Sequence, residues 1–320
     1  MVASSSGSLS NALRFRPRWP WLRFVVPALL IPASVLCGSW WLTEPLDDSP
    51  TPRRLVQVAT QPSRPISVTD PAPPALAPGW PEGRLEGDEA KRVLLGSLRV
   101  ADAALDKIEG YTCLFHKQER LSGKLGEEQT MEMKVRNEPF AVYLKFLTPQ
   151  GGKEVVYCSG RHENKVIAHT SGGLSRLLLP RLAVPPSHPL ALADNRHPIT
   201  DAGLAALLDK LIRFRQMDLT DPEAVTIIDR TTDSHGKPVL RSIHSHPNRH
   251  ADRPFQRVEV LYDPGTKLPI QITNYDWPEL GQVGPPLLAE HYEYENLNLD
   301  ADLDDLDFDP ANPEYAFQRY

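Results

Sequence analysis

The sequence has 320 residues, of which 32 are prolines, and a formal net charge of −6 at pH 7. Its first 43 residues contain four arginines and no acidic residue, and removing these four positive charges leaves −10 for residues 44–320. So acidic a chain lacks the basic surface that neutralises phosphates, which excludes nucleic acid as a partner. Behind a proline-rich stretch there remain roughly 235 residues, enough for one domain with a sizeable core.

The N-terminal region is typical of a membrane-targeting sequence. Residues 1–23 carry the four arginines, and residues 24–42 contain no charged residue. A helix over residues 24–42 would span roughly 28 Å, close to the hydrocarbon thickness of a bilayer. The arginines place its start in the cytoplasm, and Trp40 and Trp41 lie at its far end, where aromatic rings favour the interface. We expect a cytoplasmic N-terminus over 1–23 and a transmembrane signal anchor over 24–42, with an exported C-terminal domain that is periplasmic or extracytoplasmic.

Two alternatives to a retained anchor were weighed. A cleaved signal peptide needs small residues before the cut, and Cys37 and Ser39 meet this requirement poorly. A lipoprotein would need a small residue directly before Cys37, where Leu36 stands. The anchor is therefore favoured, and cleavage stays the main alternative.

A proline-rich segment follows over residues 43–86. It contains ten prolines, which exclude a helix or an interior strand. Such a segment is extended, semi-rigid and partly polyproline II. We expect a disordered linker that spaces a domain over residues 87–320 away from the membrane.

The domain begins with an amphipathic helix over residues 88–108, and a second helix is expected over 201–216 with Thr200 as its N-cap. A helical turn is possible over 174–179. Ten short segments are expected to form strands, and the first three of them show an apolar face at a spacing of two residues. They are 111–120, 129–136, 140–146, 154–159 and 166–170, then 224–229, 238–246, 256–263, 268–275 and 288–296. This order predicts an α+β fold, with one large antiparallel sheet of about ten strands that curls into a half-barrel, and both helices covering its concave face.

Several strings in the domain carry a resemblance to a known family: YTCLFHKQER, PFAVYLKFLTP, GKEVVY, NRHPIT, and LAEHYEYENLNL followed by DFDP. Together they resemble a family of exported bacterial proteins known as domain-of-unknown-function family 1571, over roughly residues 93–317. The element order is also similar to the periplasmic lipoprotein-carrier (LolA-like) half-barrel. This second resemblance implies a hydrophobic cavity between sheet and helices that can hold acyl chains; it does not fix the function.

The most consistent apolar strand face is the candidate wall of such a cavity. A flexible methionine lining suits a variable lipid tail, whereas ordinary core packing is the more common role of an apolar stripe. If a pocket exists, these six residues are its expected ligand-binding wall: Met131, Met133, Phe140, Val142, Leu144 and Phe146.

Asn195, Arg196 and His197 form a polar motif before the second helix. One interpretation is a pocket-edge cluster near a helix N-terminus, which attracts an anion. The preferred interpretation is a cap and loop anchor, in which these side chains satisfy backbone groups.

Other polar clusters were assigned to the surface. His244, His246 and His250 are expected in a solvated hairpin loop, because no zinc-ligand spacing surrounds them. The aspartates of residues 300–309 fail the calcium-loop pattern and are expected to form a solvated acidic tail. For Cys113 and Cys158, two separate buried thiols are favoured over a disulfide, which export would permit.

No catalytic constellation, nucleophile elbow or phosphate-binding loop is present in the sequence. We therefore expect no enzyme, no cofactor and no bound metal. The favoured function is non-enzymatic binding of a lipid, lipoprotein or other apolar ligand in the cell envelope, by a protein that contacts the membrane through its N-terminal helix. The alternative is a structural or assembly module that binds another envelope protein through its sheet. A third hypothesis is a hydrolase around His197 or His244.

Overall fold

The computed structural model describes residues 79–169, 181–278 and 284–318. The expected anchor over residues 24–42, most of the expected linker and the turn over 174–179 lie outside these ranges. Within the described ranges, no helix is both long and apolar enough to cross a membrane.

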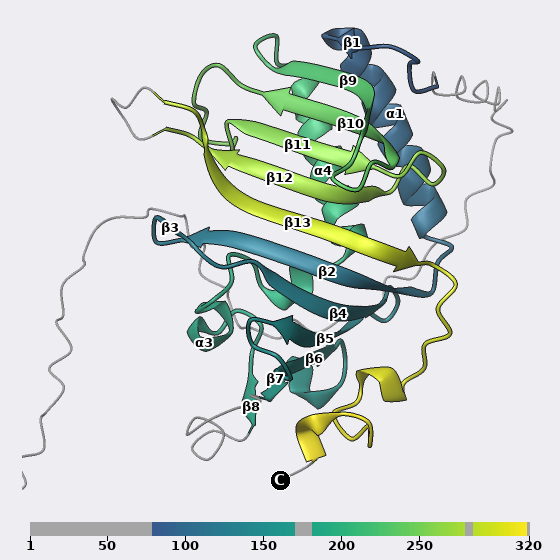
Figure 1. The fold of residues 1–320 in the computed structure, drawn as a ribbon, viewed down its shortest axis with the longest axis vertical. Coiled ribbons are helices and arrows are strands. Elements are labelled where there is room, and N and C mark those ends of the chain that lie inside the picture. Colours follow the sequence, from purple (N-terminus) through teal and green to yellow (C-terminus); the bar gives the residue numbers. More distant parts are fainter. Residues whose placement is uncertain (1–78, 170–180, 279–283, 319–320) are drawn as a thin grey trace, which may run out of the picture. The chain divides into compact units, whose positions relative to one another are not determined.

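The domain is built on one open antiparallel sheet (Figure 1), in which the described strands follow the order β1-β9-β10-β11-β12-β13-β2-β4-β5-β6-β7-β8, with β3 paired to β2. The first series comprises β2 (Gly110–Leu121), β4 (Gln129–Arg136), β5 (Ala141–Thr148), β6 (Glu154–Cys158), β7 (Val166–His169) and β8 (Leu182–Val184). The second comprises β9 (Val225–Thr232), β10 (Pro238–Ser245), β11 (Arg257–Tyr262), β12 (Pro269–Asp276) and β13 (Leu287–Asn298). The short strands β1 (Leu85–Glu86) and β3 (Lys124–Leu125) complete it.

The pairing of β2 with β13 joins the two series into a single sheet. Each of these strands is 12 residues long, so they form the central ladder of the molecule. The expected α+β class and large antiparallel sheet are confirmed. The three strands beyond the ten expected ones are pieces of two or three residues at edges and turns.

Two helices pack against each other on one face of the sheet, called here the inner face. They are α1 (Asp88–Leu105) and α4 (Leu204–Asp218), and Figure 1 shows both behind β9–β13. The apolar residues of α1 recur every three to four positions, so one stripe is buried, including Leu94, Leu98 and Ala101. A third, short helix, α3 (Pro189–Leu192), precedes α4.

The start of α4 differs from the expected one. Thr200 is not its N-cap, because residues Ile199–Asp201 form a 3₁₀ turn and the helix begins after Gly203. The backbone N–H of Leu204 donates instead to the buried hydroxyl of Tyr111, at 2.7 Å. Gly203 has φ 94°, and a Cβ there would lie 2.8 Å from the same hydroxyl, so only glycine fits this approach to the sheet.

The C-terminal segment packs on the opposite, outer face. Four of the six aspartates of residues 300–309 are exposed, as expected of a solvated acidic segment, but the segment is held against the sheet and is not a free tail. Phe308 is fully buried there, and the ring of Tyr315 stacks on Tyr143 with centroids 4.0 Å apart. Asp305 pairs with Arg136 at 2.7 Å and also with the loop after β6, while a second aspartate pairs with β4. Basic residues of the outer face thus hold the acidic segment in place.

The two cysteines of the domain lie on opposite faces of the sheet. Cys113 belongs to the core beneath α1 and α4, and Cys158 to the cluster under the C-terminal segment. Both are free and buried, as expected. Burial raises the pKa of Cys113 to about 12, so its thiol is unreactive.

The fold begins earlier than expected, within the segment assigned to the linker. Trp80 is 8% exposed, and its indole N–H donates to the carbonyl of Asp229 at 3.0 Å. Leu85 and Glu86 then pair with β9 as strand β1. The last residues of the proline-rich stretch therefore tie the first helix to one edge of the sheet.

Candidate functional site

A cavity of about 640 Å³ lies between the inner face of the sheet and the segment that leads from α3 into α4. Strands β2, β4–β8, β12 and β13 contribute to its floor, while α4 and residues 194–203 contribute to its cover. Protein interiors are close-packed and rarely leave voids larger than a water molecule. A space of this size falls within the range of ligand-binding pockets, roughly 300–1,000 Å³.

The apolar side of the cavity is built by one end of the first strand series. Three of the six expected wall residues line it: Met131, Leu144 and Phe146. The other three pack beside it. Met133 and Val142 are fully buried in the core, and Phe140 contacts the ring of Tyr157. Further apolar lining comes from Phe115, Val155, Val166, Ala168, Leu182 and Val184.

Strand register explains this division. Met131 pairs with Phe146 at one end of the β4–β5 ladder, and Val135 pairs with Val142 at the other. The Val135 end lies beneath Gly203 at the start of α4, where the helix fills the space. The Met131 end extends beyond the helix and faces the cavity.

The polar side of the cavity centres on two carboxylates, Glu119 of β2 and Glu290 of β13. They are direct neighbours across the ladder and are 6% and 3% exposed. Like charges in this position repel each other unless cations compensate them. Lys117 lies 3.3 Å from Glu119, and the guanidinium Nε of Arg196 lies 3.0 Å from Glu290. The two carboxylates are thus neutralised in place.

The motif Asn195, Arg196 and His197 lies at the cavity edge and bridges it to these carboxylates. The backbone N–H of Arg196 donates to Glu119 at 3.1 Å, and His197 Nε2 lies 2.9 Å from Glu290. The side-chain oxygen of Asn195 accepts from the ammonium group of Lys117. The motif anchors the covering segment to the sheet, and it lies seven or more residues before α4 rather than at its N-terminus.

Burial and hydrogen bonds shift the pKa values of two groups in this network. Burial opposes the ionisation of Glu290, but hydrogen bonds from His197 and Asn274 lower its pKa. Burial and the two nearby carboxylates raise the pKa of Tyr292, whose hydroxyl donates to Glu119. The network forms the polar wall of the cavity.

Sequence reasoning missed the charged part of this wall, although a signal was present. The alternation that places Tyr111, Cys113 and Phe115 on the inner face continues without a break to Lys117 and Glu119. Charged residues in inward register on a long strand indicate a polar site at the edge of a core.

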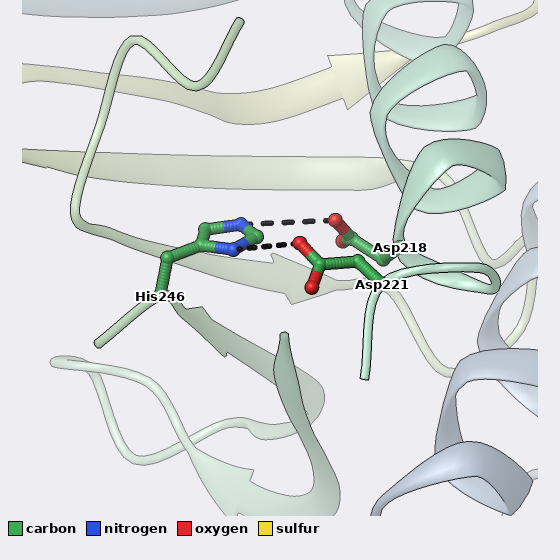
Figure 2. Close-up of side chains that lie close together, drawn as sticks. All are labelled: Asp218, Asp221 and His246. Carbon is green, nitrogen blue, oxygen red and sulfur yellow. Dashed lines mark ion pairs between the residues drawn. The ribbon is translucent and has the colours of Figure 1, made fainter. Parts of the chain in front are cut away.

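Three side chains with metal-ligand chemistry converge at the end of α4: Asp218, Asp221 and His246 (Figure 2). The imidazole nitrogens of His246 lie 3.7 Å from Asp218 and 3.6 Å from Asp221. However, a guanidinium nitrogen of Arg253 lies 3.2 Å from Asp218 and 3.6 Å from Asp221. Arg215 Nε is a further 2.9 Å partner of Asp218. Two guanidinium groups balance the two carboxylates, so the cluster is an ion-pair network that joins α4 to the end of β10.

The expectation of a solvated loop was wrong for two of the three histidines. His244 and His246 are 1% and 5% exposed, because residues 242, 244 and 246 of this strand all face inward. His244 Nδ1 lies 3.0 Å from the hydroxyl of Thr226. Only His250 of the three reaches solvent, with a side chain that is 44% exposed.

The burial of His244 predicts that stability falls in mild acid. Burial, with the charge of Arg215 as a further cause, lowers the pKa of His244 well below the ordinary value of 6.5. Below pH 6.5 the unfolded chain binds a proton at this histidine that the folded chain does not. The free energy of unfolding therefore falls by up to about 1.4 kcal/mol for each unit by which the pH is lowered. Above that value both states are neutral, and this contribution is absent.

Urea unfolding between about pH 5 and pH 7.5 measures the slope of the free energy of unfolding against pH. His244→Gln should flatten it, whereas His235→Gln, at an exposed turn, should leave it unchanged. An equal slope in wild type and His244→Gln would contradict the assignment.

Several solved structures are similar to the chain at low sequence identity. A putative outer membrane lipoprotein-sorting protein domain from Vibrio parahaemolyticus is 10% identical, with a TM-score of 0.33 over 67% of this chain and 95% of that chain. Lipoprotein LppX from Mycobacterium tuberculosis is 10% identical, with a TM-score of 0.35 over 66% and 98%. A LolA superfamily protein from Nitrosomonas europaea is 11% identical, with a TM-score of 0.26 over 67% and 96%. The expected likeness to lipoprotein-carrier structures is found, and it identifies no ligand for this chain.

In sequence, no curated protein matches the chain. A family model described as "Protein of unknown function (DUF1571)" matches residues 108–317, which include every strand from β2 to β13 and the whole cavity floor. The sequence strings around β2, β5 and β13 that carried the resemblance lie within this match, which covers well over half of the chain. The chain therefore belongs to the DUF1571 family.

Proposed function

We propose that this protein is a non-enzymatic carrier or sensor that binds an apolar ligand, a lipid or an acyl chain, in the cavity beneath the segment from α3 to α4. The observation that carries the proposal is the cavity itself, about 640 Å³ in volume and lined on one side by strand residues such as Met131, Leu144 and Phe146. Exposing such surface to water is unfavourable. An apolar ligand that covers it contributes about 25 cal/mol of favourable binding free energy for each Å² of apolar surface removed from water.

The proposed location is the outer side of the cell membrane, with the domain tethered through residues 24–42. The arginine-flanked uncharged segment and the proline-rich spacer support this placement. A tethered domain with an apolar cavity would act close to the bilayer from which its ligand comes.

The geometry gives little support to a hydrolase. Ser242 Oγ does lie 3.2 Å from His244 Nε2, which is a nucleophile–base distance. Both residues are at most 1% exposed, neither lines the cavity, and the serine hydroxyl also bonds Tyr262. At the cavity edge, His197 is held by Glu290. No serine, threonine or cysteine is found among the described residues that line the cavity.

The proposal is tested by titrating the full chain with N-phenyl-1-naphthylamine, a neutral apolar dye whose fluorescence rises in apolar surroundings. We expect saturable binding at one site on each chain, above the linear partitioning seen with the membrane or detergent alone. Linear partitioning without saturation would overturn the proposed function.

A further inference from the structure

One cation of the cavity differs from the others in its surroundings. Lys153 precedes β6 and lines the cavity on its apolar side. Its ammonium group lies 4.5 Å from the centre of the Phe146 ring and 3.0 Å from the side-chain oxygen of Gln150. Among the residues that the structure describes, no carboxylate lies within ion-pair distance of it.

The other partly or fully buried cations of the lining are neutralised at close range. Lys117 pairs with Glu119 at 3.3 Å, Arg196 with Glu290 at 3.0 Å, and Lys210 with Asp201 at 2.8 Å. At the far end, Arg215 and Arg253 share the carboxylate of Asp218. Lys153 therefore contributes positive charge that nothing at ion-pair distance balances.

The charges near Lys153 are one carboxylate, that of Asp194, and one further ammonium group, that of Lys117. Burial lowers the pKa of Lys153, the charge of Asp194 raises it, and the charge of Lys117 lowers it, so the two ammonium groups repel each other across the same space. An anion between them would relieve this repulsion and form charge-assisted hydrogen bonds.

The wall next to Lys153 is apolar, so the part of the ligand beyond its head should be apolar too. Phe146, Leu144 and Val155 lie next to Lys153, and the edge strands β7 and β8 continue the apolar surface with Val166, Ala168, Leu182 and Val184. A volume of about 640 Å³ lies within the range of ligand-binding pockets, roughly 300–1,000 Å³, and holds one long acyl chain.

We propose that the cavity selects a single-chain amphiphile with an anionic head, a carboxylate or phosphate, which binds Lys153 while the tail lies along the apolar strand wall. This inference rests on the proposed function, because it names the ligand class of the same cavity.

The test is displacement of N-phenyl-1-naphthylamine from the full chain by three ligands with the same tail: palmitate, hexadecyl phosphate and hexadecanol. For the wild type, at least one of the two anions should displace the dye at a concentration about tenfold or more below that of hexadecanol, as a charge-assisted hydrogen bond implies. The anion that displaces the dye at the lower concentration identifies the preferred head group as a carboxylate or a phosphate.

Lys153→Gln should abolish this preference, so that palmitate, hexadecyl phosphate and hexadecanol displace the dye at similar concentrations. The matched control is Lys145→Gln, which removes the same charge from the outer face of β5, where the side chain is 43% exposed. The control should retain the preference.

Two results would overturn the inference: equal displacement by hexadecanol and both anions, or an equal loss of preference in Lys153→Gln and Lys145→Gln. In either case the dye still binds and the proposed function stands. Absence of saturable dye binding would overturn the proposed function, and the inference with it.

Discussion

Ala168→Trp should abolish ligand binding by filling the cavity. Ala168 lies on β7 and faces the cavity between Val155 and Leu182, its neighbours across the strands. A tryptophan there would occupy the space that an acyl chain needs, and β-strands accommodate aromatic residues well. We expect saturable binding of the neutral dye to be lost, a change of at least about a hundredfold in apparent affinity if roughly 3 kcal/mol of apolar contact is removed.

The matched control is Ala183→Trp on the adjacent edge strand. Ala183 pairs with Ile167 and is exposed, so its side chain points to the outer side of the same ladder. This variant should bind the dye as the wild type does. Equal binding by wild type and Ala168→Trp would place the ligand outside the cavity.

Asp218→Asn should strongly destabilise the fold. The carboxylate is 1% exposed and balances Arg215 at 2.9 Å and Arg253 at 3.2 Å. Removing its charge leaves Arg215 without this partner, and leaves Arg253 with only the more exposed carboxylates of Asp221 and Asp252. Breaking a buried ion pair in this way costs about 3–5 kcal/mol. Urea unfolding of the full chain would measure the loss.

The control for this prediction is Asp252→Asn. Asp252 also contacts Arg253, at 3.4 Å, but its side chain is 61% exposed. An exposed pair contributes about 1 kcal/mol or less. If Asp218→Asn costs no more than Asp252→Asn, the ion-pair network does not hold α4 to the sheet as described.

Local patterns in the sequence predicted the elements well. Short segments between turn signals, some of them alternating, identified all ten main strands, and apolar spacing of three and four identified α1 and α4. The tight turns of the first series predict an antiparallel meander before α4.

The features that depend on distant residues could not be predicted in the same way. The pairing of β2 with β13 joins residues more than 150 positions apart, and no local pattern encodes it. The same pairing creates the facing carboxylates Glu119 and Glu290, and Arg196 reaches them only because the covering segment folds back across the ladder.

Charge pairing with distant residues determines the position of two polar segments. Polar segments are usually solvated, and this is why His246 was expected in a solvated loop. His246 lies instead among two aspartates and Arg253, and these charges make its burial possible. Asp305 stays exposed, but its pairs with Arg136 and Arg161 hold the C-terminal segment to the outer face. Such pairing cannot be read from either segment alone.

The most direct test of the account is to identify what the cavity holds. The full chain, its Ala168→Trp variant and its Ala183→Trp variant would be purified in parallel without added lipid, extracted with organic solvent, and analysed by mass spectrometry. The account predicts a single-chain apolar ligand in stoichiometric amount from the wild type and Ala183→Trp, and none above background from Ala168→Trp. Equal amounts of the same lipids from all three proteins, or none from any, would contradict it.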